Sequence, residues 1–143
     1  MKKTLSLLSF LIVFCSYGQH LECKDFKKGT FLLTSEDFPG VEWEIKRKKR
    51  TQKEVTVNIP SKYKKLGYPT APTYAKIEWI NQCTYKLIYV KKESKLDEFQ
   101  NSINENGGII TNLKESEGRC FTYISRFKFK DLQMEGKGKI CKK

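Results

Sequence analysis

The densest group of charged side chains in this sequence is a run of five cations, Lys46, Arg47, Lys48, Lys49 and Arg50. Adjacent positive charges attract anionic polymers, because their fields add over about a Debye length, ~8 Å at physiological salt. The whole chain has the same bias, with 28 Lys and Arg against 16 Asp and Glu. The run is therefore a predicted anion-binding site, for lipopolysaccharide phosphates, acidic polysaccharide or extracellular nucleic acid. The alternative is a solvated hairpin tip whose charge prevents aggregation.

Aromatic side chains form a second group that could bind a ligand. They recur at alternate positions of short segments. Alternation places them on the inward face of β-strands. One interpretation is that they line a cavity for a small apolar ligand. The other is that they pack together as a filled core. The candidate ligand-binding residues are Trp43, Trp79, Tyr85, Tyr89 and Tyr123.

Catalytic and metal-binding side chains are scarce. His20 is the single histidine, so no serine–histidine or cysteine–histidine arrangement is expected. The absence of a C-x-x-C spacing argues against a structural zinc site. Paired carboxylates such as Glu42 and Glu44 would lie roughly 7 Å apart on one strand face, a separation that glycosidases also use. They are expected to point to solvent among lysines, so we predict no enzyme and no cofactor, with a carboxylate-dependent hydrolase as the alternative.

Residues 1–18 have the three parts of a secretory signal peptide. Lys2 and Lys3 supply the positive end, residues 5–14 are largely apolar, and Ser16 to Gly18 offer a small residue for cleavage. The apolar run is well short of the roughly 20 residues that span a bilayer. We therefore expect residues 19–143 to form one exported domain, periplasmic or extracellular, that does not span a membrane.

The elements that must position these side chains are predicted to be antiparallel hairpins. A loop at residues 49–51 would pair Ile45 with Val55 and Trp43 with Val57, all apolar and all on one face. Residues 60–73 hold three prolines and predict a longer loop. A turn at residues 81–83 would then pair Trp79 with Tyr85, Ile77 with Leu87 and Ala75 with Tyr89.

One helix is predicted between the strands, over residues 94–106. Ser94 is a suitable N-cap, and Leu96, Phe99 and Ile103 make an apolar stripe at helical spacing. The glycines at 107 and 108 end the helix, because glycine tolerates a left-handed backbone.

Two C-terminal hairpins complete the pattern. A loop at residues 116–118 would pair Leu113 with Phe121 and Thr111 with Tyr123, with Gly118 at a positive φ. A two-residue turn at Lys130 and Asp131 would pair Phe129 with Leu132, Phe127 with Met134, and Arg126 with Glu135.

The predicted disulfide pairing follows from the register of the last hairpin. Four cysteines lie after the predicted signal, an even number that in an exported chain indicates two disulfides with three possible connectivities. The turn at Lys130 and Asp131 places Cys120 opposite Cys141, although the cysteines played no part in choosing it. Cys23 and Cys83 are then left to form the second disulfide.

The predicted fold is all-β: an antiparallel up-and-down meander of about eight strands that forms a small barrel or half-barrel, with one helix. A single sheet with one apolar face must close on itself or be covered. Eight strands suit a barrel that is filled by side chains or holds one small ligand.

Two segments resemble a family of small, exported, largely uncharacterised bacterial proteins. They are C-K-D-F-K-K-G-T-F at residues 23–31 and W-I-N-Q-C-T-Y-K-L at residues 79–87. Most members of that family carry only the first two cysteines, and some carry a topoisomerase label that no nucleotide site here supports. The Gly-x-aromatic start of the first strand, Gly29 to Phe31, also resembles the calycin or lipocalin pattern. These resemblances imply a fold rather than an activity.

The sequence thus leads to two functional hypotheses. The first is an exported, non-enzymatic, calycin-like binding protein whose ligand is unknown. The second is a basic module that docks on anionic envelope polymers through residues 46–50. The strong positive charge does not indicate a specific nucleic-acid partner, because no nucleic-acid-binding motif is present.

Overall fold

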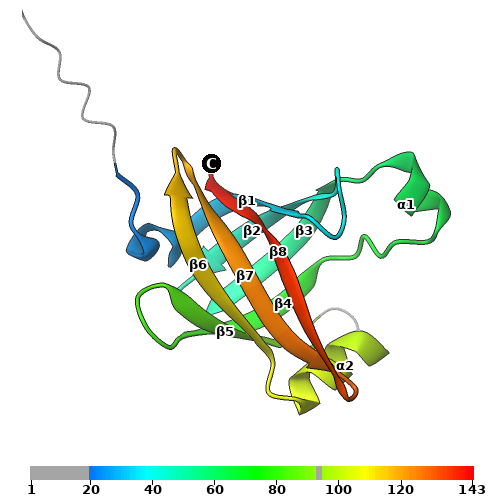
Figure 1. Cartoon of the computed structure of the whole chain (residues 1–143). Helices are drawn as coiled ribbons and strands as arrows, with labels where there is room; N and C mark the ends of the chain where they lie inside the picture. Colours follow the sequence, from blue (N-terminus) through cyan, green and yellow to red (C-terminus); the bar gives the residue numbers. More distant parts are fainter. Residues whose placement is uncertain (1–19, 93–94) are drawn as a thin grey trace, which may run out of the picture.

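The computed structural model describes residues 20–92 and 95–143, and within them eight antiparallel strands close into a barrel (Figure 1). Each strand pairs with the next along the chain, and the first pairs with the last. The predicted all-β barrel is confirmed, and it is closed rather than half-open. The signal segment lies outside the described residues. The strands are β1 (Gly29–Ser35), β2 (Glu42–Lys48), β3 (Thr51–Asn58), β4 (Thr73–Trp79), β5 (Thr84–Tyr89), β6 (Ile109–Glu117), β7 (Cys120–Phe129) and β8 (Leu132–Lys142).

Among the residues that the structure describes, three short helices lie at the two ends of the barrel. The 3₁₀ helix η1 (Cys23–Phe26) precedes β1, α1 (Ser61–Lys65) lies in the loop between β3 and β4, and α2 (Glu98–Glu105) lies between β5 and β6. Up-and-down topology puts η1 at one end, where β1 begins and β2 ends. It puts α1 and α2 at the other end (Figure 1). Within the described residues, no helix is long and apolar enough to cross a membrane.

The predicted registers of two hairpins are confirmed. In β4 and β5, Trp79 lies opposite Tyr85 and Ala75 opposite Tyr89. In β7 and β8, Cys120 lies opposite Cys141 and the turn falls at Lys130 and Asp131. Both predicted disulfides are present, Cys23–Cys83 and Cys120–Cys141.

The predicted register of β2 and β3 is wrong by one residue over most of its length. The turn has two residues, Lys49 and Arg50, so Ile45 lies opposite Glu54 rather than Val55. Lys49 adopts a φ of 48°, which a tight turn between twisted strands requires. A one-residue shift moves every side chain of β3 to the opposite face of the sheet. Val57 is therefore 50% exposed. The predicted register resumes only at Glu42 and Asn58, beyond a β-bulge.

The shift turns three polar side chains of β3 toward the barrel axis, at Gln52, Glu54 and Thr56. Arg47 also faces inward, because it shares the inner face of β2 with Trp43 and Ile45, and Arg47 and Gln52 are both buried. Arg47 lies directly opposite Gln52 in this register. The hydrogen bond between Arg47 and Gln52 favours the observed register over the predicted one, which would bury Val55 and Val57.

The predicted pairing of β6 and β7 is wrong by two residues, because the turn is Gly118-Arg119 and a bulge follows Leu113. Leu113 lies opposite Tyr123 and Thr111 opposite Ser125. A shift of two residues keeps each side chain on its predicted face. The positive φ of Gly118 is confirmed at 59°.

The predicted helix is confirmed in its second half, and it begins later than expected. Asp97 is the N-cap of α2 and its side chain accepts a hydrogen bond from the Gln100 backbone. Ser94, the predicted cap, lies outside the described residues. The side-chain amide of Asn104 hydrogen-bonds both the N–H and the C=O of Tyr89, at 2.9 and 2.8 Å. These bonds fix α2 on the end of β5.

Candidate binding site inside the barrel

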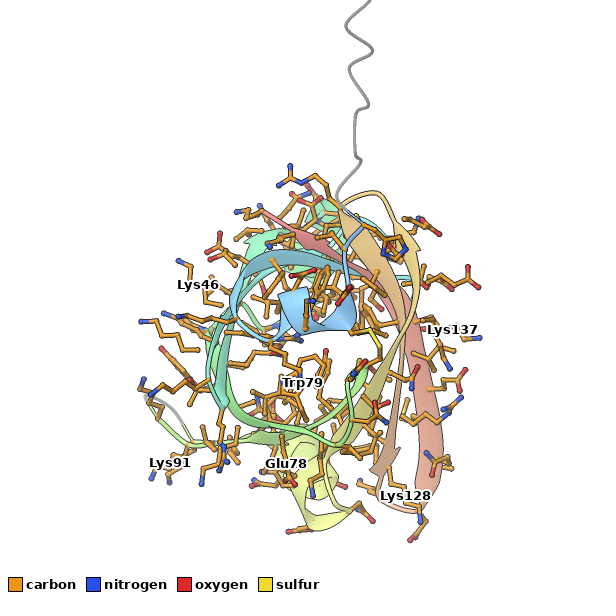
Figure 2. The ribbon with its side chains drawn as sticks, turned by 90° about the vertical axis from the view of Figure 1, so that its left-hand side faces the viewer. Lys46, Glu78, Trp79, Lys91, Lys128 and Lys137 are labelled. Atoms are coloured by element: carbon orange, nitrogen blue, oxygen red, sulfur yellow. A yellow bond between two sulfur atoms is a disulfide. The ribbon has the colours of Figure 1, made fainter. Side chains whose placement is uncertain are left out.

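One end of the barrel is sealed by η1. Phe26 is fully buried, with its ring 5.1 Å from Phe31 and 5.2 Å from Phe121. The Cys23–Cys83 disulfide ties η1 to the turn between β4 and β5. Figure 2 shows η1 lying across the ring of strands, with Trp79 pointing into the ring beneath it. η1 therefore covers this end of the barrel.

A buried arginine lies under this seal. Arg47 is 1% exposed, and its guanidinium donates to the Phe26 carbonyl at 2.8 Å, the Tyr85 hydroxyl at 2.7 Å and Gln52 Oε1 at 2.6 Å. Its Cζ also lies 4.4 Å from the centroid of the Tyr85 ring, a cation–π contact. Sequence reasoning placed Arg47 among the surface cations of a hairpin tip. It lies in the core instead, and four of the five predicted anion-binding residues remain on the surface.

A polar chain runs from Arg47 toward the open end. Gln52 accepts from Arg47 with its oxygen and donates from Nε2 to Glu54 Oε1 at 2.6 Å. Thr73 donates to the other oxygen of Glu54 at 3.3 Å. Burial raises the pKa of Glu54, while these hydrogen bonds and the Arg47 charge act in the opposite direction. Gln52 thus links the buried Arg47 to the half-buried Glu54, which makes no hydrogen bond to Arg47.

Above this chain lies a hollow of about 250 Å³ inside the barrel. Four of the five aromatic residues predicted to bind a ligand line this hollow, namely Trp43, Tyr85, Tyr89 and Tyr123. Trp79 does not line the hollow. Its ring packs 5.0 Å from that of Tyr85 near the sealed end, and its indole nitrogen is buried without a hydrogen-bond partner in the described structure.

Two of the tyrosines that line the hollow are largely removed from water. Burial raises the pKa values of Tyr89 and Tyr123 well above their ordinary range. The Tyr123 hydroxyl donates to the Thr34 carbonyl at 3.0 Å. A side chain at Gly138 would meet both groups, because a Cβ there would lie 2.8 Å from the Tyr123 oxygen. Gly138 lies directly opposite Tyr123, so glycine at this position lets the Tyr123 side chain pass over β8 and reach Thr34 on β1.

The open end is framed by the loop around α1 and by α2. Phe38 makes edge contacts with Trp43, Tyr63 and Tyr68, at ring distances of 5.4 to 6.3 Å. This cluster holds the proline-rich loop against the barrel. Between the loop and α2 is an outer chamber of about 300 Å³.

The inner hollow and the outer chamber meet at five residues that line both. The sequence did not predict Phe99 or Glu54 at this place, because Phe99 lies on a helix and Glu54 on the face of β3 that was predicted to point outward. The signal that could have found Glu54 is the alternation of Gln52, Glu54 and Thr56 on one face. The shared residues are Trp43, Glu54, Tyr68, Tyr89 and Phe99.

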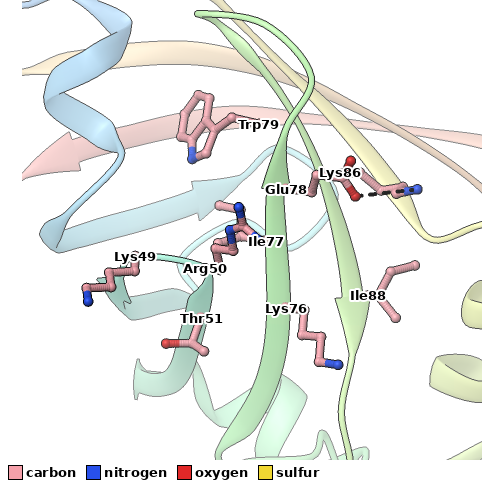
Figure 3. Close-up of a pocket in the computed structure, with 9 residues that line it drawn as sticks. All are labelled: Lys49, Arg50, Thr51, Lys76, Ile77, Glu78, Trp79, Lys86 and Ile88. Atoms are coloured by element: carbon pink, nitrogen blue, oxygen red, sulfur yellow. Dashed lines mark ion pairs between the residues drawn. The ribbon is translucent and has the colours of Figure 1, made fainter.

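The exposed cations form a separate surface on the outside of the barrel. Lys49 and Arg50 of the β2–β3 turn border a groove of about 880 Å³ beside β4 and β5 (Figure 3). Lys76 and Lys86 also line it, and the single carboxylate there is Glu78, 3.9 Å from the Lys86 amine. The predicted anion-binding residues Lys46 and Lys48 border a neighbouring depression.

The carboxylate pair considered for hydrolysis lies outside the barrel. Glu44 contacts Lys143 at 2.6 Å and Lys46 at 3.0 Å. The hydrogen bond from Lys143 and that from Lys46 lower the pKa of Glu44, which suits an ion pair and not a general acid. Within residues 20–92 and 95–143, no three His, Cys, Asp or Glu side chains are grouped so that they could hold a metal ion.

Comparison of the chain with protein-family models, curated proteins and solved structures found no match.

Proposed function

We propose that the chain is an exported, non-enzymatic binding protein of calycin-like shape that holds a small molecule inside its barrel. The observation that carries the proposal is the hollow of about 250 Å³ between a sealed end and an open one. Small-molecule sites are concave, largely preformed and mostly apolar, with a few placed polar groups. The aromatic lining and the Glu54 carboxylate match that description.

Export is the second part of the proposal. It is supported by the signal-like pattern of residues 1–18 and by the two disulfides, which persist in oxidising compartments. The family resemblance of residues 23–31 and 79–87 points to the same location, in the periplasm or outside the cell.

Ligand binding predicts a change in the fluorescence of Trp43, which lines the hollow, and little change in that of Trp79, which does not. Screening the processed, oxidised protein against a panel of small apolar and amphipathic compounds should reveal a ligand. At about 100 times its Kd, a ligand should raise the unfolding free energy by about 2.7 kcal/mol. A Trp43→Phe control should lose most of the fluorescence change. Absence of any thermal or fluorescence response across the panel would contradict the proposal.

A second candidate function is docking on anionic envelope polymers through the exposed cations. The observation that favours it is the groove in Figure 3, where Lys49, Arg50, Lys76 and Lys86 face one carboxylate. Lipopolysaccharide phosphates and acidic polysaccharides carry the complementary charge. Such binding weakens as salt screens the charges.

The docking hypothesis is tested by heparin affinity as a function of salt. Changing four exposed cations of the tip to serine should weaken binding at least tenfold, since each cation near an anionic surface contributes about 1 kcal/mol. Arg47 is left intact, because it lies in the core. If a control that removes four lysines from β6, β7 and β8 weakens binding equally, the tip is not the site. The tip residues are Lys46, Lys48, Lys49 and Arg50, and the control residues are Lys114, Lys128, Lys137 and Lys139.

A further inference from the structure

We propose that the ligand of the barrel is a small organic cation, an amine or quaternary ammonium with an apolar portion, held by Glu54 and the aromatic rings around it. This inference rests on the proposed binding function and adds the chemical class of the ligand. It comes from the contrast between the charge of the lining and the charge of the rest of the chain.

The lining of the inner hollow is acidic, although the protein as a whole is strongly basic. The chain as a whole has a formal net charge of +12. The hollow is nevertheless lined by two carboxylates, Glu54 and Asp37, and by no lysine or arginine. Arg47 lies behind Gln52 and Tyr85, and its guanidinium is engaged with three acceptors. The inner hollow therefore offers an anionic ligand no cation, whereas Lys92 and Lys95 line only the outer chamber, together with Asp97.

The residues shared by the hollow and the outer chamber have the composition of a cation-binding box. One of the five is a carboxylate, and the other four are aromatic. Aromatic faces attract ammonium groups through the ring quadrupole, most strongly when the cation is desolvated. The four rings come from three different parts of the fold: Trp43 and Tyr89 from strands, Tyr68 from the proline-rich loop and Phe99 from α2.

The hydrogen bonds of Glu54 leave its charge without direct neutralisation. Its two protein partners are the neutral side chains of Gln52 and Thr73, and burial disfavours its ionised form. Part of the residue remains exposed and faces the two chambers. A bound cation would restore the charge balance of the carboxylate, whereas a neutral apolar ligand would not.

The test compares two ligands of the same shape and different charge. Choline is the cationic probe, and its neutral carbon isostere carries a tert-butyl group in place of the trimethylammonium group. Titration of the processed, oxidised protein, followed by NMR, should show that choline binds at least about tenfold more tightly than the isostere, as a desolvated cation–π site requires. Equal affinity of the two probes, or tighter binding of the isostere, would overturn the cation assignment.

Two charge-removing variants locate the effect. Glu54→Gln keeps the size and the acceptor oxygen of the side chain, and it should weaken choline binding about tenfold while leaving the binding of the isostere unchanged. The matched control Glu78→Gln removes an exposed carboxylate outside the barrel and should change neither affinity. An unchanged choline affinity in Glu54→Gln, with the variant folded by circular dichroism, would overturn the role of Glu54.

The outcomes also separate this inference from the proposed function. If neutral compounds of the panel bind in the hollow and choline does not, the barrel is a binding protein and the cation assignment is wrong. If neither the panel nor either probe binds, both proposals are wrong together.

Discussion

Replacing Arg47 with methionine is expected to lower the unfolding free energy by about 3–5 kcal/mol. The guanidinium supplies three hydrogen bonds in the core, to the Phe26 carbonyl, the Tyr85 hydroxyl and Gln52. Methionine fills much of the volume but leaves these acceptors without a donor, and each buried unsatisfied group costs about 1–3 kcal/mol. Burying the charge is itself unfavourable, and its removal offsets part of the loss. Urea denaturation of the oxidised protein, followed by tryptophan fluorescence, measures the difference.

The matched control for this variant is Arg50→Met. Arg50 is an exposed arginine three positions along the chain, on the β2–β3 turn. Its replacement is expected to change the unfolding free energy by less than about 0.5 kcal/mol. If Arg47→Met were as stable as the parent protein, the buried hydrogen bonds would contribute no net stability.

Removing the Cys23–Cys83 disulfide, with both cysteines changed to alanine, is expected to cost about 4 kcal/mol of unfolding free energy. The bridge joins residues 60 positions apart, and a longer closed loop restricts the unfolded chain more. The loss should also be local, because this bridge fastens η1 over the end of the barrel. Acrylamide should then quench Trp79 more strongly, since Trp79 packs beneath that end.

The second disulfide provides the comparison for this prediction. Cys120–Cys141 joins residues 21 positions apart, so its removal is expected to cost about 3 kcal/mol. It should leave the quenching of Trp79 unchanged, because it links β7 to β8 and does not hold η1. A larger loss from Cys120–Cys141 than from Cys23–Cys83 would contradict this account. Equal quenching in the two variants would mean that η1 remains in place without its bridge.

The alternation of apolar residues and the turn residues were sufficient to predict strand pairing where apolar side chains alone decide the register. The pairing of Trp79 with Tyr85 and that of Cys120 with Cys141 followed from the sequence, as did both disulfides. The β2–β3 register was wrong because Val55 and Val57 look like core residues when Arg47 is assumed to be in solvent. A buried arginine with its own acceptors is not visible in a hydrophobic pattern.

The candidate site could be predicted only in part, for a related reason. Alternation along single strands identified Trp43, Tyr85, Tyr89 and Tyr123 as inward-facing. The box around Glu54 also needs Tyr68 and Phe99, which come from a loop and a helix. Their positions depend on contacts between distant segments, such as the packing of Phe38 on Tyr68, and local sequence does not encode those contacts.

The hydrogen-bonded seam between β1 and β8 determines the order in which this molecule can fold. Phe31 lies opposite Lys142 across that seam. The ring therefore closes only when the first strand and the last strand meet. Contacts between residues so far apart in sequence form slowly, since a large loop must close before any of them is made. Before that seam forms, the meander presents two unpaired strand edges, on β1 and β8, and such edges recruit other chains. Pairing of β8 with β1 therefore removes both free edges in one step.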